Sequence, residues 1–160
     1  MKPSLELLKA DVRDELAKLE QLRQTFAALT PMLAKTPDEV PFYDRAALGY
    51  YLHSFYNGCE NIFRAVARFF ENDLDADGWH RDLLKRMKLE LPGYRPALID
   101  EELYALLNDF RDFRHVFRHS YTFELDWERE RLVASKLDRA ASLLREQVEV
   151  FLGGLEDLDA

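Results

Sequence analysis

Residues 4–33 read SLELLKADVRDELAKLEQLRQTFAALTPML, and the spacing of their apolar side chains decides the fold. Apolar positions recur three and four residues apart, which is typical of a helix with one buried face. They are Leu5, Leu8, Val12, Leu16, Leu19, Leu22, Phe26, Leu29 and Leu33. The spacing predicts a long N-terminal helix that ends at Pro31 or Pro37. A coiled coil would have the same spacing, but we favour a packed antiparallel bundle.

Residues 44–70 repeat the helical pattern after a proline-containing loop. Asp44 is a suitable residue to cap this helix. Gly58, near its middle, suggests close packing against a neighbour. The inward positions are predicted to be Ala47, Tyr51, Phe55, Ile62, Ala65, Val66, Phe69 and Phe70.

The C-terminal half predicts three more helices. A short helix covers residues 79–87, and an irregular, proline-containing stretch follows it. A longer helix covers residues 100–117 and is capped by Asp100. The last helix begins near Asp126 or Ser135 and continues to about residue 153.

No window alternates with the period of a strand, so we predict an all-α fold, an up-and-down bundle of about five helices. The 160 residues suit a single domain. We expect residues 1–36 to form the long N-terminal helix, packed on a core of residues 44–152.

Charge and cysteine content exclude several function classes. Lys plus Arg number 22 against 30 for Asp plus Glu, a net charge of -8, so an anionic partner such as RNA needs a local basic patch. The single cysteine, Cys59, excludes an internal disulfide and a zinc knuckle. We find no spanning segment and no signal peptide, and we therefore expect a cytoplasmic protein without membrane contact.

Two patterns resemble metal sites, and we interpret neither as one. Residues 73–78, DLDADG, match the first half of a calcium loop, but Leu84 stands where the bidentate glutamate should be. His115 and His119 are four residues apart on one helical face, yet arginines surround them and no third ligand is near. We expect no metal and no cofactor.

The stretch RDFRHVFRHSY, residues 111–121, has unusual chemistry for an acidic chain: three arginines and two histidines beside one acid. Arg114 and Tyr121 project close to the aromatic stripe of the helix, and a buried arginine requires a partner. His119 lies about 140° away from Arg114 on the wheel. Joint action would require a distorted helix or a second subunit. A second basic cluster lies at residues 79–96, and ion pairing with neighbouring helices is the alternative explanation for both.

The pattern Arg114-x4-His119-x-Tyr121 resembles the R-x4-6-H motif of the HEPN superfamily, in the R-x4-H-x-Y form of HepT toxins. Three stretches are similar to HepT-like proteins: YLHSFYNGCENIFRAVARFF at 51–70, WHRDLLKRM at 79–87 and FRHSYTFELDWERE at 117–130. The resemblance covers roughly residues 45–152.

The resemblance implies an α-helical, dimeric, metal-independent ribonuclease, the toxin of a toxin–antitoxin pair. Its antitoxin would be a minimal nucleotidyltransferase (MNT) that attaches AMP to the motif tyrosine. Carried over by position, Arg114 and His119 are the catalytic pair and Tyr121 is the modified residue. A non-catalytic HEPN module that binds a nucleotide or a protein is the alternative, and a purely structural bundle is a third possibility.

The residue types suit RNA cleavage without a metal. RNA carries its own nucleophile, the 2′-hydroxyl, so a histidine to move protons and an arginine to hold the phosphorane suffice. We assign Arg111, His115 and Arg118 to phosphate contact on charge and proximity alone.

Overall fold

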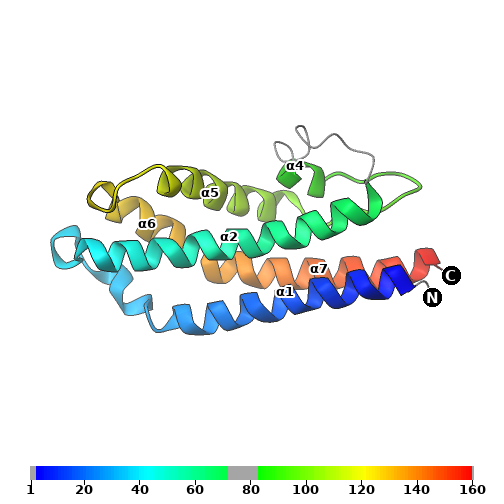
Figure 1. Cartoon of the computed structure of the whole chain (residues 1–160), viewed down its shortest axis with the longest axis horizontal. Coiled ribbons are helices and arrows are strands. Elements are labelled where there is room, and N and C mark those ends of the chain that lie inside the picture. The colour runs from blue at the N-terminus through cyan, green and yellow to red at the C-terminus, as the bar shows by residue number, and fades with distance from the viewer. Residues whose placement is uncertain (1–2, 72–82, 160) are drawn as a thin grey trace.

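Four long helices lie side by side and alternate in direction in the computed structural model, which describes residues 3–71 and 83–159 (Figure 1). They are α1 (Pro3–Ala27), α2 (Phe42–Phe70), α5 (Glu101–Arg118) and α7 (Leu137–Asp159). Shorter elements are α4 (Leu83–Met87), α6 (Trp127–Ala134) and the 3-10 turns η1 (Thr30–Ala34), η2 (Pro37–Glu39) and η3 (Thr122–Glu124).

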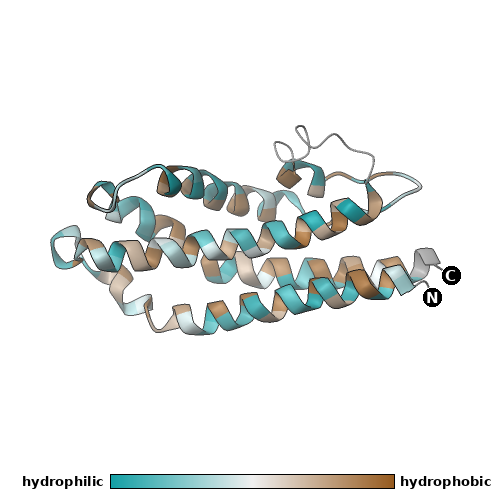
Figure 2. Cartoon of the chain, viewed as in Figure 1, coloured by the Kyte–Doolittle hydropathy of each residue, from teal (hydrophilic) through white to brown (hydrophobic). Residues whose placement is uncertain are grey.

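The fold is an all-α, up-and-down bundle, as the sequence predicts. Helix α1 packs on α2 and α7, and α5 packs on the same two helices. Teal and brown alternate along each long helix in Figure 2, as expected of helices with one buried face. Leu91 and Arg95 form an isolated bridge, and the described residues contain no strand.

The beginning of α1 and the end of α7 lie at the same end of the bundle (Figure 1). There the Lys9 ammonium on α1 donates to Glu156 Oε1 on α7 over 2.7 Å. The η3 turn lies at the opposite end, where α5 finishes (Figure 1).

Helix α1 is shorter than predicted because of Pro31. Its apolar face is buried through Phe26, but the α-helix ends at Ala27 and the chain continues into η1. Proline lacks an N–H donor and its ring clashes with the carbonyl four residues earlier, which is that of Ala27. Leu33 therefore lies in η1, outside α1, and the predicted helix over residues 1–36 is wrong beyond Ala27.

Helix α2 begins earlier than predicted, and its packing glycine is confirmed. Pro41 occupies the N-cap, whereas Asp44 lies in the first turn, where a carboxylate favours the positive end of the helix dipole. A Cβ added at Gly58 would lie 2.4 Å from Leu19 Cδ2, so only glycine allows α1 and α2 to approach this closely. Ala47, predicted to point inward, is exposed.

Both candidate starts of the last helix are real breaks. Asp126 caps α6 by accepting from the Glu128 amide over 3.0 Å, and Ser135 follows its last residue, so the segment forms two helices. Asp100 caps α5 by accepting from the Leu103 amide over 2.9 Å, as predicted. Of the predicted helix 79–87, residues 83–87 form α4, and its beginning lies outside the described residues.

Candidate functional site

Arg114 is the centre of a polar site between α5 and α2. Its Nη1 donates to Glu60 Oε1 over 2.7 Å, and its Nη2 donates to Glu60 Oε2 over 2.9 Å. Both side chains are largely buried, with exposed fractions of 16% and 10%. The sequence expectation that Arg114 lies along the aromatic face with a partner is confirmed: its guanidinium also lies 4.7 Å from the centre of the Tyr56 ring.

A chain of hydrogen bonds extends from Arg114 along α2. Nη1 also donates to Asn57 Oδ1 over 3.0 Å, which leaves the Asn57 amide nitrogen to donate to His53 Nε2, also over 3.0 Å. His53 Nε2 is then an acceptor, and the ring proton is on Nδ1. Arg64, one turn beyond Glu60, donates to Glu60 Oε1 over 3.0 Å.

These contacts leave one edge of Arg114 uncommitted. Glu60 occupies the end-on edge formed by Nη1 and Nη2, and Asn57 occupies the other Nη1 hydrogen. A guanidinium has five N–H donors, so Nε and the second hydrogen of Nη2 remain, without an acceptor among residues 3–71 and 83–159. That side-on edge matches two oxygens of a phosphate group.

Arg114 also lines a cavity of about 440 Å³. Its lining consists of polar residues from the two facing helices: His53, Asn57, Glu60, Arg64, Arg114 and Arg118. Burial lowers the pKa of His53 from its ordinary value, and the positive charges of Arg114 and Arg118 lower it further. His53 is therefore a neutral imidazole at pH 7.

His119 does not line this cavity. It is the C-cap of α5, exposed to solvent, and its ring lies 4.8 Å from that of His115, edge to face. Helix α5 is regular through Arg118, so the two proposed catalytic residues stay on different faces of one chain.

Tyr121 is not on α5, which corrects the expectation that it projects with the aromatic stripe. The helix ends at Arg118, Ser120 Oγ donates to the Val116 carbonyl over 2.7 Å, and the chain then turns into η3 with Tyr121 at its N-cap. The Tyr121 amide donates to Glu124 Oε1 over 2.7 Å. Its ring is 71% exposed and stacks on Phe123, with 5.4 Å between ring centres.

The three expected phosphate contacts are separated. Arg118 lines the cavity beside Arg114, whereas Arg111 and His115 are outside its lining. Arg111 is half-buried near Tyr56, where its charge lowers the pKa of that phenol against the raising effect of burial.

The second basic cluster is largely neutralised by ion pairs. Arg95 is buried and donates to Glu71 over 3.1 Å, and Arg86 donates to the other Glu71 oxygen over 3.3 Å. Lys88 donates to Glu101 over 2.9 Å. The ion-pair interpretation therefore holds for Arg86, Lys88 and Arg95, whereas the exposed Lys85 forms no ion pair with the described residues.

The residues of α2 in the site were not found by sequence reasoning. His53, Asn57, Glu60 and Arg64 are spaced by four, three and four, which places them on one face of a helix. Polar residues at core spacing in an apolar helix are the signal that could have identified them, because such residues need buried partners.

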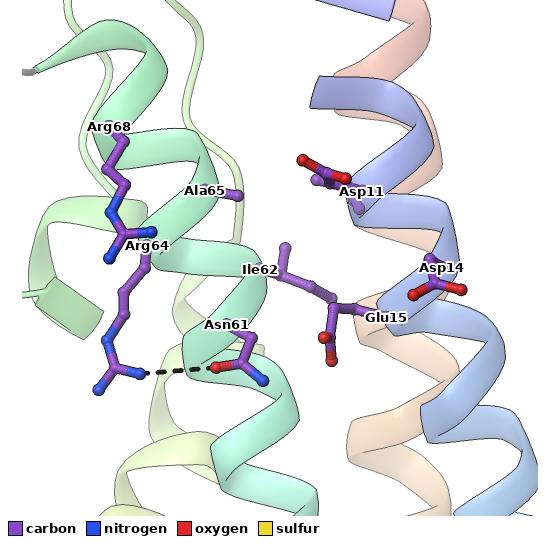
Figure 3. Close-up of a pocket in the computed structure, with 9 residues that line it drawn as sticks. Asp11, Asp14, Glu15, Asn61, Ile62, Arg64, Ala65 and Arg68 are labelled. Atoms are coloured by element: carbon purple, nitrogen blue, oxygen red, sulfur yellow. Dashed lines mark hydrogen bonds between the residues drawn. The ribbon is translucent and has the colours of Figure 1, made fainter. Parts of the chain in front are cut away.

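A second cavity, of about 310 Å³, lies between α1 and α2 and has a different charge. Figure 3 shows Asp11, Asp14 and Glu15 on α1 opposite Arg64 and Arg68 on α2. Three carboxylates against two guanidinium groups leave this cavity slightly acidic.

Among the described residues no group of three or more His, Cys, Asp or Glu side chains is arranged to hold a metal ion. The half calcium loop at residues 73–78 and His80 lie outside the described residues. Within the described part of the chain, no helix is both long and apolar enough to span a membrane.

Comparison with known proteins gives one match. Searches of curated proteins and of solved structures find nothing similar to this chain. Residues 47–155 match the protein family described as HepT-like protein, a range that includes the α2 face, α5 and the η3 turn. The match covers more than half of the chain, and with the all-helical bundle it shows that the chain belongs to the HepT-like family of the HEPN superfamily, whose general type is a ribonuclease toxin.

Proposed function

We propose that this HepT-like protein is a metal-independent endoribonuclease toxin that cleaves RNA through attack of the 2′-hydroxyl. The observation that carries the proposal is that the Arg114 guanidinium is held in place while some of its N–H donors have no acceptor among the described residues. Glu60 and Asn57 fix its guanidinium, its side-on edge has no acceptor among the described residues, and Arg114 lines a cavity with excess positive charge. A preorganised cation of this kind stabilises the charge that develops on a phosphorane.

His119 is the proposed proton-transfer group. Its imidazole is exposed to solvent, and an imidazole can exchange protons with the 2′-oxygen and the leaving 5′-oxygen. Since His119 is outside the Arg114 cavity of its own chain, we propose that a homodimer brings the Arg114 of one copy to the His119 of the other.

Tyr121 is the proposed control point. Its exposed phenol is accessible to an MNT-type nucleotidyltransferase antitoxin that attaches AMP. The added phosphate would compete with RNA for the same arginines. Mass spectrometry of the peptide containing Tyr121, after co-expression with such an enzyme, tests this. An unchanged mass with neutralised toxicity would contradict it.

The decisive experiment is RNA cleavage by the purified protein in EDTA. We expect products ending in a 2′,3′-cyclic phosphate and no cleavage of DNA, which lacks the 2′-hydroxyl. His119→Ala should lower the rate about 10²–10⁴-fold, as expected for a proton-transfer group. His80→Ala is the matched control, because His80 has no proposed role, and it should leave the rate unchanged.

A non-catalytic HEPN module that binds a nucleotide or protein is the second candidate. Arg114 and His119 are separated within one chain, and this separation favours the non-catalytic module over a nuclease whose active site lies within a single monomer. RNA that stays intact at high protein concentration, with retained nucleotide binding, would support this candidate and reject the nuclease.

A further inference from the structure

The cavity between α2 and α5 has an excess of positive charge. Three guanidinium groups and one carboxylate line it, and His53 is neutral, so two positive charges are uncompensated. The whole chain has a net charge of -8, and the α1–α2 cavity of Figure 3 has the opposite sign. Local charge of this kind directs an anion to one place on an acidic protein.

Several N–H donors at this cavity have no acceptor. The Arg118 side chain makes no hydrogen bond or ion pair with the described residues, and Arg118 lies one turn beyond Arg114 on the same helix. Arg64 contacts Glu60 through Nη2 and, at 3.5 Å, Asn61 through Nη1, while its Nε is buried without a partner. Donors without acceptors favour a ligand that brings oxygens.

Geometry and size both fit a phosphate group. Arg64 on α2 and Arg114 and Arg118 on α5 all line the cavity, so guanidinium forks of two facing helices border it. Such forks bind phosphate oxygens in pairs. About 440 Å³ is well above the roughly 30 Å³ of one water molecule and leaves room for part of the attached nucleotide.

We propose that Arg64 and Arg118 bind a backbone phosphate of RNA in this cavity, beside Arg114. The inference rests on the proposed function only in taking RNA as the source of the phosphate. It gives Arg64, on α2, a role outside the sequence motif, and it assigns Arg111 and His115 no part in this contact.

The test is equilibrium binding of a single-stranded RNA that is 2′-O-methylated at every position, because such an RNA lacks the nucleophile and cannot be cleaved by this route. Arg118→Gln should weaken binding about tenfold and reduce the dependence of log K on log salt by about 0.7. Arg145→Gln removes the same charge from an exposed site on α7 and should change neither quantity. Arg64→Gln should act in the same direction as Arg118→Gln.

NMR of the His53 ring nitrogens supplies a readout independent of cleavage. RNA should shift these signals in the wild-type protein, and in Arg118→Gln the same shift should need about tenfold more RNA. Equal affinity of Arg118→Gln and Arg145→Gln, absence of RNA binding, or unmoved His53 signals in the wild type would each overturn the proposal. If binding depends on Arg118 but natural RNA is not cleaved, the phosphate site is supported and the nuclease is rejected. If natural RNA is cleaved but binding does not depend on Arg118, only the phosphate site is rejected.

Discussion

Glu60 controls the availability of Arg114 because it occupies one edge of the guanidinium and leaves the other. A carboxylate that accepts two charge-assisted hydrogen bonds holds the planar group in one orientation. The sequence motif identifies Arg114. Its partner Glu60 lies on another helix and follows only from the packing of α2 against α5. The sequence therefore predicts that Arg114 needs a partner and cannot say which acid supplies it.

Glu60→Gln should destabilise the protein. The substitution keeps the shape of the side chain but leaves the largely buried Arg114 charge without a counter-ion, which costs about 1.5–3 kcal/mol for a hydrogen bond to a charged group. Urea unfolding measures this loss. Glu102→Gln is the matched control: Glu102 pairs with Arg139 through both oxygens at an exposed site, so its loss should cost close to nothing. Equal effects at the two sites would contradict the importance of burial.

Glu130 on α6 is a buried acid with neither carboxylate oxygen hydrogen-bonded to the described residues. Burial raises its pKa to about 8, and Asp126 adds to the effect. The charge of Arg45 opposes it, but the Arg45 donors go to the carbonyls of Pro37, Val40 and Leu125. Glu130 is therefore mainly protonated at neutral pH.

Glu130→Gln should increase stability at high pH. Because the folded state holds its proton up to about pH 8 and the unfolded state releases it near pH 4.3, the favourable contribution is complete below the unfolded pKa and is lost as pH rises toward 8. The thermal midpoint of the variant should match the wild type near pH 5 and exceed it at pH 8. Glu128→Gln, an exposed acid on the same helix, should show no such trend.

At the scale of the helices, the spacing of apolar residues predicts that a segment is helical and which of its faces is buried. It predicts the residues at which a helix begins and ends less well. The stripe of α1 is buried where the spacing predicts, because burial of one face is a property of the repeat itself. The end of α1 depends on one steric clash at Pro31, and the break between α6 and α7 depends on local caps. The pairing of helices, which brings the α2 residues to Arg114, depends on tertiary contacts that no local pattern reports.

Gly58 gives a direct test of the contact between α1 and α2. Gly58→Ala should destabilise the protein by about 1–3 kcal/mol, since the new Cβ would overlap Leu19. Gly153→Ala, also within a helix but with open space around its Cβ position, should stabilise by about 0.5–1 kcal/mol. Chemical denaturation of both variants measures the difference, and a neutral Gly58→Ala would show that the two helices can separate at this point.

For the whole molecule, the regular course of α5 through Arg118 excludes a distortion that would bring Arg114 and His119 together within one chain. The remaining route is a second copy. We expect sedimentation to show a dimer at micromolar concentration. Mixing the inactive Arg114→Ala and His119→Ala proteins should restore cleavage, because a mixed dimer contains one site with both residues intact. No restored activity, or a monomer at micromolar concentration, would contradict the shared site.

The beginning of α1 and the end of α7 lie together, and the turn that carries Tyr121 lies at the far end of the bundle (Figure 1). An affinity tag or surface tether attached at either terminus would therefore leave the His119–Tyr121 region facing solution. The same arrangement permits a short linker between the two termini and new ends in another exposed loop, since neighbouring termini tolerate circular permutation. The architecture thus separates the places where the chain can be joined to other molecules from the place where its chemistry is proposed to occur.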